Sequence, residues 1–326
     1  MKPGRKTQVS RKEKSMRNFT PAVIVLLLIA TYAIAWETPI NLGDTINTNF
    51  NEWYPILAED GSFMIFVSDR VEGMGGMDIW ISYWTGTGWD VPQNIGPNIN
   101  TSYDESAPFL AEDDSKLYFL STDPAGFGAG DIWFCDLTGG VPGPKTNMGA
   151  PINGPYYDCC PVITHSGNRF YICSSRPGGV GGIDIWISEW TGSAWDTPFN
   201  AGTAVNTAGS DCPRWISDSD MDFVIVSTGP GGYGYADLYS ASTSGDSLGS
   251  KANLGPVINT VHAELGPGFL ENGGVIGGTM FFGSGRPGGF GGRDIWYSLG
   301  TGALESVTWA GVKRAFADGV CPCSTE

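Results

Sequence analysis

The 326-residue sequence contains few basic residues and only two histidines. Its 18 Lys and Arg stand against 34 Asp and Glu, which gives a formal net charge of −16 at pH 7. A chain this acidic is repelled by phosphate groups, so nucleic acid and anionic lipid surfaces are disfavoured as partners. Cations, sugars and basic protein surfaces are the partners that the charge favours.

Several metal-binding and catalytic signatures are also lacking. No C-x-x-C pair occurs among the seven cysteines, and His165 and His262 are too few to complete a zinc site. Neither histidine belongs to a recognisable catalytic triad. The sequence therefore predicts no cofactor, and it leaves the identity of any bound metal open.

The one long apolar run lies at the N-terminus. A basic stretch over residues 2–17 precedes an apolar run over residues 21–35, which ends in Ala33-Ile34-Ala35, a cleavage signal of the A-x-A type. The run is short for a membrane span, and a retained anchor is the alternative. We predict that residues 1–35 are a signal peptide and that the mature chain begins at Trp36. Such a chain is exported, periplasmic or extracellular, and has no stable membrane span.

A repeat with constant spacing organises the rest of the chain. The phrase N-x-G-x-x-[Ile/Val]-N recurs every 53 residues, with copies that begin at Asn41, Asn94, Asn147, Asn200 and Asn253. A second phrase, Asp-Ile-Trp or Asp-Leu-Tyr, recurs at Asp78, Asp131, Asp184, Asp237 and Asp294. A fixed period of this length, rich in short β-type runs, indicates a ring or stack of identical supersecondary units.

Each repeat has the pattern of a propeller blade, which is four short antiparallel strands. The first copy of the Asn phrase precedes the first blade, and the last blade lacks a copy, so residues 36–39 are expected to supply the outer strand of the last blade. Closing the ring in this way removes exposed sheet edges. We predict an all-β, five-bladed β-propeller of four-stranded antiparallel blades over residues 36–300, closed by the N-terminal strand. A short tail over residues 301–326 is unassigned.

The repeats also resemble a known family. The stretch 174–186, SSRPGGVGGIDIW, is similar to the WD-like β-propeller repeat of the TolB type, which also occurs in N-terminal regions of OmpA-family cell-envelope proteins. The resemblance covers roughly residues 36–298 and implies a propeller in the bacterial envelope or outside the cell. This sequence shows neither a peptidoglycan-binding OmpA domain nor a TolB N-terminal domain, so the partners of those proteins are not carried over.

Five acidic residues recur at the expected start of the innermost strands, beside the central channel: Glu52, Glu105, Asp158, Asp211 and Glu264. Three hypotheses fit them. Each carboxylate caps backbone N–H groups of its own turn, or the ring of charge binds a ligand or a cation such as calcium, or the carboxylates are catalytic. We place the candidate binding site at the mouth that these residues form. Asp211 fits on the assumption that the fourth repeat lost one residue just after it.

Aromatic residues fall into two groups. One group recurs at a single strand position and is expected between the blades: Trp80, Trp133, Trp186 and Trp296. The other group does not recur and lies near the acidic face. Its members are the candidate sugar-stacking residues Trp53, Tyr54, Tyr103, Tyr156 and Tyr157.

The Gly-rich loops before each repeated Asp are expected to be structural, because glycines supply the positive φ of a tight loop. Three arginines, each eight residues before the repeated Asp, are expected to pair with it: Arg70, Arg176 and Arg286. Cys160 and Cys212 both precede the repeat proline, so we expect them at equivalent places in adjacent blades. The sequence does not fix the disulfide connectivity.

From these features we predict an exported, non-catalytic β-propeller, a binding or scaffold protein of the bacterial cell envelope. Its expected partner is an envelope protein or an extracellular polymer. We predict that it is not an enzyme, because a glycosidase needs two carboxylates with different environments, whereas the repeated acids look equivalent. The alternative is a five-bladed-propeller glycoside hydrolase or a glycan-binding lectin.

Overall fold

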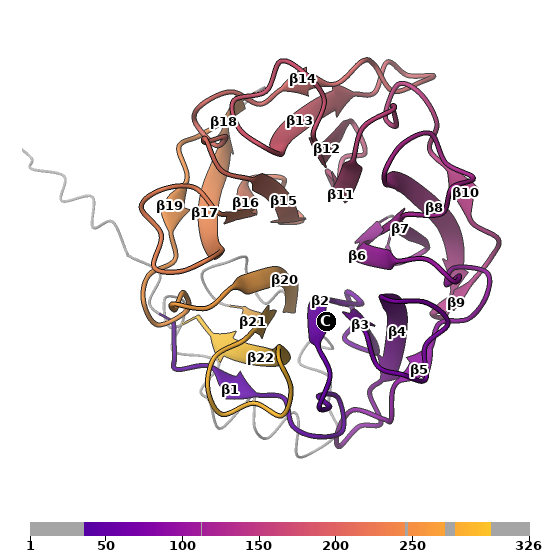
Figure 1. The fold of residues 1–326 in the computed structure, drawn as a ribbon, viewed down its shortest axis with the longest axis vertical. Coiled ribbons are helices and arrows are strands. Elements are labelled where there is room, and N and C mark those ends of the chain that lie inside the picture. Colours follow the sequence, from indigo (N-terminus) through magenta and orange to yellow (C-terminus); the bar gives the residue numbers. More distant parts are fainter. Residues whose placement is uncertain (1–35, 112, 245–246, 271–277, 301–326) are drawn as a thin grey trace, which may run out of the picture. The chain divides into compact units, whose positions relative to one another are not determined.

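The computed structural model describes residues 36–111, 113–244, 247–270 and 278–300. These residues form five antiparallel sheets arranged around a central axis (Figure 1). The predicted five-bladed β-propeller is therefore confirmed. No helix within these ranges is long and apolar enough to cross a membrane. The predicted signal peptide and the C-terminal tail lie outside the described residues.

Each blade has three long strands, of which the first lies innermost, and a short outer strand. Blade 1 consists of β2 (Glu52–Leu57), β3 (Phe63–Ser68), β4 (Asp78–Tyr83) and β5 (Gln93–Asn94). Blade 2 consists of β6 (Glu105–Ala111), β7 (Lys116–Ser121), β8 (Asp131–Thr138) and β10 (Thr146–Asn147), with β9 (Val141–Pro142) paired to β8. Blade 3 consists of β11 (Asp158–Ile163), β12 (Arg169–Ser174), β13 (Asp184–Glu189) and β14 (Phe199–Asn200).

The remaining two blades complete the ring. Blade 4 consists of β15 (Asp211–Ile216), β16 (Asp222–Ser227), β17 (Asp237–Ser244) and β19 (Ala252–Asn253), with β18 (Ser247–Leu248) paired to β17. Blade 5 consists of β20 (Glu264–Leu270), β21 (Thr279–Ser284), β22 (Asp294–Leu299) and β1 (Ile40–Asn41).

The N-terminal segment closes the ring, as predicted, but its strand β1 lies at Ile40–Asn41 rather than at residues 36–39. β1 pairs with β22 in the register Ile40 to Tyr297 and Asn41 to Trp296. The backbone N–H of Glu37 donates to the Leu299 carbonyl at 2.9 Å and extends this pairing. Blade 5 therefore joins the two ends of the described chain, and its outermost strand comes from the start of the sequence rather than from its own repeat (Figure 1).

The Asn phrase serves to hold each outer strand against its neighbour. The Asn41 side chain accepts hydrogen bonds from the Gly43 N–H at 2.9 Å and from Asn47 Nδ2 at 3.0 Å. Asn47 in turn bonds both the N–H and the carbonyl of Ile295, at 2.7 and 3.0 Å. These contacts satisfy buried backbone groups that the two-residue outer strand leaves free. This is why the phrase recurs with the blade.

The Gly-rich loops are structural, as expected. The Asp184 carboxylate accepts hydrogen bonds from the N–H groups of Val180 and Gly181, which folds the loop back onto β13. A Cβ at Gly181 would lie 2.2 Å from the carbonyl oxygens of Thr207 and Gly209. Only glycine fits such a close backbone approach, so each loop can pack against the segment that leads into the next blade.

The repeat tryptophans lie in the core, also as predicted. Trp80, Trp133, Trp186 and Trp296 are only 4–8% exposed. The predicted pairing of the repeat arginines with the repeated Asp is wrong. The guanidinium of Arg70 lies 3.1 Å from the Glu52 carboxylate and 4.7 Å from the centroid of the Trp80 ring. Loop N–H groups bond the Asp78 carboxylate, and the arginine instead turns inward to the inner strand.

Candidate functional site

The five recurring carboxylates are completely buried at the starts of the innermost strands. Glu52 shows the arrangement. Its carboxylate accepts hydrogen bonds from the Thr48 N–H at 2.9 Å, from Thr48 Oγ1 at 2.7 Å and from Ser68 Oγ at 3.0 Å. The N–H of the residue four positions earlier donates in the same way to Glu105, Asp158, Asp211 and Glu264. These contacts are those of the capping hypothesis.

Each of these carboxylates also has its own cation. Arginine supplies it in three blades, as Arg70, Arg176 and Arg286, with N···O distances of 3.1, 2.8 and 3.5 Å. Because the five carboxylates have no exposed surface and are each paired, the ring does not present free charge at the channel mouth. Binding of calcium or another ligand by these residues stays a prediction.

The cation comes from a different place in blades 2 and 4. There the arginine position holds Asp123 or Gly229, and a lysine that precedes the outer strand, Lys145 or Lys251, replaces it. Lys145 repeats the arginine contacts: its Nζ lies 3.9 Å from Glu105, 3.4 Å from the Ile99 carbonyl oxygen and 5.0 Å from the centroid of the Trp133 ring. This exchange leaves the arginine position open to other residue types.

Blade 2 fills that open position with a further carboxylate. Asp123 Oδ2 lies 3.3 Å from Lys145 Nζ, and the Asp123 side chain is 20% exposed. Asp104, also half-buried, sits at the same end of the β6–β7 pair, because the Thr122 N–H donates to its carbonyl at 3.0 Å. In no other repeat is either of these two positions acidic.

Glu105 follows Asp104 in the chain and shares Lys145 with Asp123, whereas the Asp104 carboxylate accepts a hydrogen bond from the Met77 N–H of the blade 1 loop at 2.9 Å. Since Lys145 contacts both carboxylates, at 3.9 and 3.3 Å, the oxygens of Glu105 and Asp123 are at most about 7.2 Å apart. Burial raises the pKa of Glu105, although hydrogen bonds from Ser121 and Thr101 and the charge of Lys145 oppose this. Blade 2 thus contains three acidic side chains in different environments.

Only two of the five predicted sugar-stacking aromatic residues present their rings to solvent. Tyr103 is 44% exposed and Tyr156 is 36% exposed, at equivalent positions before β6 and β11. Trp53 is buried, and Tyr54 and Tyr157 are half-buried. The tip of the adjacent Gly-rich loop adds Phe127, which is 59% exposed. The Ala129 N–H of this loop donates to the Tyr156 carbonyl at 3.1 Å, so Phe127 and Tyr156 lie on one face.

The five inner strands line a small cavity at the axis. The cavity has a volume of about 10 Å³ and is lined in part by Tyr54, Cys160 and Arg214. This volume holds about one water molecule. Arg214 occupies the place that proline has in the other repeats, and its guanidinium lies 4.1 Å from the centroid of the Tyr54 ring. Burial raises the pKa of Tyr54 to about 12, partly offset by the charge of Arg214.

The fourth repeat has not lost a residue at this point, so that assumption is wrong. In blade 4, strand β15 pairs Cys212 with Val226 and Trp215 with Val224. In blade 3, strand β11 pairs Cys159 with Cys173 and Val162 with Tyr171. Both bulges therefore contain the same number of residues, and the proline has simply moved by one position. Cys212 is consequently equivalent to Cys159, not to Cys160 as predicted.

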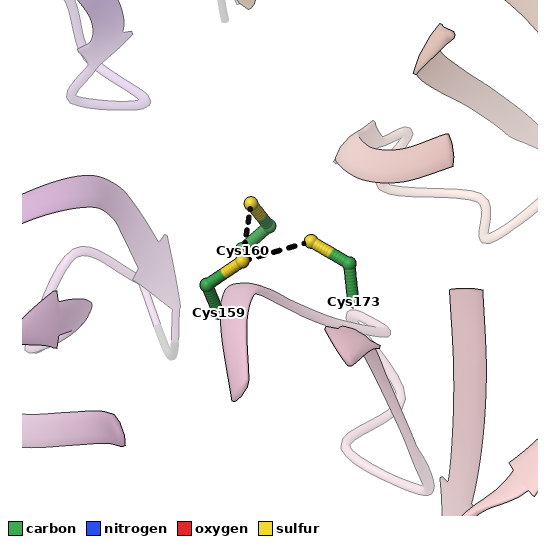
Figure 2. Close-up of side chains that lie close together, drawn as sticks. All are labelled: Cys159, Cys160 and Cys173. Atoms are coloured by element: carbon green, nitrogen blue, oxygen red, sulfur yellow. Dashed lines mark hydrogen bonds between the residues drawn. The ribbon is translucent and has the colours of Figure 1, made fainter. Parts of the chain in front are cut away.

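Four of the five cysteines in the described ranges gather beside the axis, which sequence reasoning missed. Figure 2 shows the side chains of Cys159, Cys160 and Cys173 pointing toward one another. The Sγ atoms of Cys159 and Cys173 are 3.0 Å apart, and those of Cys160 and Cys159 are 3.3 Å apart. Cys212 packs against the same cluster. The detectable signal was the hairpin register, which places Cys173 opposite Cys159.

The charge of Arg214 acts on this cluster. Burial disfavours the thiolate of Cys160, but hydrogen bonds from the neighbouring cysteines and the charge of Arg214 hold its pKa well below the usual range. The pKa of Cys173 is raised by burial and by its cysteine neighbours.

No protein-family model matches the chain, and the search among curated proteins found no match. Among solved structures, the chain is similar to the catalytic domain of an α-L-arabinofuranosidase from Coprinopsis cinerea, with a TM-score of 0.51 and 10% identity over 82% of this chain and 98% of that chain. It is also similar to an endo-arabinase from Bacteroides thetaiotaomicron, with a TM-score of 0.53 and 11% identity over 84% of this chain and 100% of that chain. A TolB protein from Agrobacterium tumefaciens has a TM-score of 0.46 and 13% identity over 82% of this chain and 92% of that chain.

These comparisons correct two predictions. A non-catalytic binding or scaffold protein, and the absence of enzyme activity, are contradicted because the similar five-bladed propellers include several glycoside hydrolases. At these identities the similarity establishes the fold alone. The sequence argument treated the repeated acids as equivalent, whereas Glu105 differs from the other four in sharing its lysine with a second carboxylate, Asp123.

Proposed function

We propose that this chain is a glycoside hydrolase that acts on a polysaccharide outside the cytoplasm. The observation that carries the proposal is in blade 2, where Glu105 and Asp123 share Lys145 and Asp104 precedes Glu105 in the chain, so that the repeat departs from its own pattern. The fold supports it, since similar propellers include an α-L-arabinofuranosidase and an endo-arabinase. Arabinose-containing polysaccharides are therefore the first substrates to test. The predicted leader is consistent with a polymeric substrate outside the cell.

The chemistry requires two carboxyl groups. One protonates the leaving oxygen of the glycosidic bond, and the other attacks the sugar carbon or activates a water molecule. Asp104 and Asp123 are the two half-buried carboxylates at the exposed end of β6 and β7 and are assigned to contact the substrate. Glu105 is fully buried, so it acts through Lys145, which it positions beside Asp123.

The surrounding surface suits a sugar chain. Tyr103 and Tyr156 present rings at the same face, and Phe127 adds a third. Aromatic rings combine an apolar face with rigid geometry, which favours stacking on the C–H face of a sugar. The predicted extracellular polymer partner becomes the substrate in this proposal. The TolB-type repeat accounts for the scaffold and supplies no residue of the site.

The test is hydrolysis of a polysaccharide panel, including arabinan, arabinoxylan, xyloglucan and galactan, measured by the release of reducing ends. Asp104→Asn and Asp123→Asn should each lower kcat/KM by about 100-fold or more, the range for loss of an acid–base group. Asp69→Asn is the matched control, because Asp69 is a half-buried carboxylate at the equivalent end of blade 1. It should retain activity. A folded parent chain that cleaves none of these polymers would refute the proposal, as would full activity in both blade 2 variants.

A further inference from the structure

We propose that the cysteine cluster beside the propeller axis is a binding site for a thiophilic metal ion, of the class of Zn(II) and Cu(I). Its ligands are Cys159, Cys160 and Cys173, with Cys212 as the fourth. The site is separate from the carboxylates of blade 2 and does not depend on the proposed hydrolase function. The ligands come from two adjacent blades, so a bound ion would also link blade 3 to blade 4.

The geometry is that of a compact set of sulfur donors. The Sγ atoms of Cys159, Cys160 and Cys173 all lie within 4.8 Å of one another, and all three residues are buried. Sulfur atoms around a tetrahedral zinc are about 3.8 Å apart, since the Zn–S bond is about 2.3 Å. The observed separations of 3.0 and 3.3 Å require the side chains to spread by less than an ångström. Small rotamer adjustments supply that movement.

The identity of the donors selects the class of metal. Thiolates favour soft or borderline ions such as Cu(I) and Zn(II), whereas calcium and magnesium require oxygen donors. Neither histidine belongs to the cluster. The calcium ion considered from the sequence is therefore not a candidate for this site.

Arg214 is the second, independent observation. Its Nε is buried without a hydrogen-bond partner, and none of the ion pairs among the described residues includes its guanidinium. The residue is half-buried and its guanidinium lies over the Tyr54 ring, so it has an aromatic neighbour but no counter-charge in the described part of the chain, and leaving a partly buried cation unpaired is costly. A centre of three or four thiolates with Zn(II), or of two or three with Cu(I), carries net negative charge. It would therefore compensate Arg214, which stands where the other four repeats have proline.

A disulfide is the competing state of the same residues. Cys159 and Cys173 face each other across β11 and β12, so removal of two hydrogens by a disulfide oxidant would join them. That bond would consume two ligands and leave Cys160 and Cys212 as free thiols. It would also leave Arg214 without the negative charge that a metal–thiolate centre provides. Three sulfurs close to one another, with Cys212 packed against them, are more donors than a disulfide uses and favour the metal.

The experiment uses the full chain with Cys321→Ser and Cys323→Ser, which removes the thiols outside the described residues. The reduced protein is titrated anaerobically with Zn(II) and, separately, with Cu(I), each against a competing chelator. One ion should bind per chain, and Co(II) in place of Zn(II) should give thiolate charge-transfer absorbance. Cys173→Ser and Cys212→Ser should each weaken binding by more than about 100-fold, beyond the loss expected for an outer-sphere partner.

Cys135→Ser is the matched control, since Cys135 is a buried free cysteine on β8 outside the cluster. It should bind the ion as the parent does. Circular dichroism checks that each variant folds. Cys212 is only half-buried, so Cys212→Ser is the variant that should disturb the core least. The proposal fails if the folded parent binds neither ion. It also fails if Cys135→Ser weakens binding as much as Cys173→Ser, or if the anaerobically isolated chain has a Cys159–Cys173 disulfide.

Discussion

Blades 2 and 5 begin their inner strands with the same residue type, and both glutamates have the same first contacts. Glu105 accepts hydrogen bonds from the N–H of Thr101 and from Ser121 Oγ, both at 2.7 Å, and Glu264 accepts the corresponding bonds from Thr260 and Ser284, both at 2.9 Å. Burial raises the pKa of both glutamates. Up to this point the two blades are copies of one structural unit.

They differ in where the balancing cation comes from. In blade 5 Arg286 follows β21, bonds the Ile258 carbonyl and stacks on Trp296. In blade 2 Lys145 makes the equivalent contacts from the far side of the blade, which leaves position 123 free for a carboxylate. The repeat therefore maintains the scaffold, and in the proposed hydrolase the catalytic residues stand where one of its contacts is supplied from elsewhere. The following predictions test this comparison.

The largest expected effect concerns the outer strands. Blade 5 takes its outer strand from the N-terminus, whereas β10 of blade 2 belongs to its own repeat. Deletion of residues 36–47 should expose the edge of β22 and abolish cooperative unfolding near the parent melting temperature, with aggregation through that edge. Thermal denaturation followed by circular dichroism measures this. An unchanged melting transition would show that blade 5 does not need β1, contrary to the closed ring.

An intermediate effect concerns the two glutamates. The pKa values of both glutamates are raised in the folded state, so the folded protein binds their protons more tightly than the unfolded chain does. This contribution to stability is complete below the unfolded-state pKa, and it is lost as the pH rises through the folded-state pKa. The free energy of unfolding should therefore fall less between about pH 4 and pH 7 in Glu105→Gln and Glu264→Gln than in the parent. Urea denaturation at several pH values measures this.

The same two variants should differ in catalysis. Glu105→Gln should change the pH profile of hydrolysis, because Glu105 and Asp123 share Lys145. Glu264→Gln serves as the matched control, since it loses an equivalent buried charge far from blade 2 and should leave the profile unchanged. Identical pH profiles of kcat/KM for the two variants would mean that blade 2 is only another copy of the scaffold.

The sequence was sufficient for the architecture because the fold depends on local, repeated contacts. The phrase around Asn41 and Asn47 is itself the hydrogen-bonding unit of each outer strand, so its period directly counts the blades. The core tryptophans were predictable for the same reason. The lysine exchange was visible too, because positions 145 and 251 hold lysine, while the equivalent positions 39, 92 and 198 hold proline.

The site was less predictable because it depends on contacts between residues far apart in the chain. Lys145 meets Asp123 only after β8 and the β8–β9 hairpin have folded back, and no spacing rule gives the 3.3 Å contact. The acidic ring was expected to face a ligand because the sequence gives the position of a carboxylate but not its burial. The cysteine cluster was missed because a ligand search by C-x-x-C spacing does not consider residues opposed across a hairpin.

The smallest expected effect concerns the exposed aromatic residues. Tyr103 of the segment before β6 and Tyr235 of the blade 4 loop are 44% and 78% exposed, so replacing either with Ala should change the free energy of unfolding by no more than about 0.5 kcal/mol. Only Tyr103 stands beside the acidic side chains of blade 2. Tyr103→Ala should therefore raise the KM for polysaccharide by roughly three- to tenfold, which corresponds to about 0.6–1.4 kcal/mol of lost stacking. Tyr235→Ala should leave KM unchanged. Steady-state kinetics on a polymeric and a short substrate separates stacking from catalysis, because the short substrate does not reach Tyr103. Equal KM values for the two variants would place the sugar chain on another part of this face.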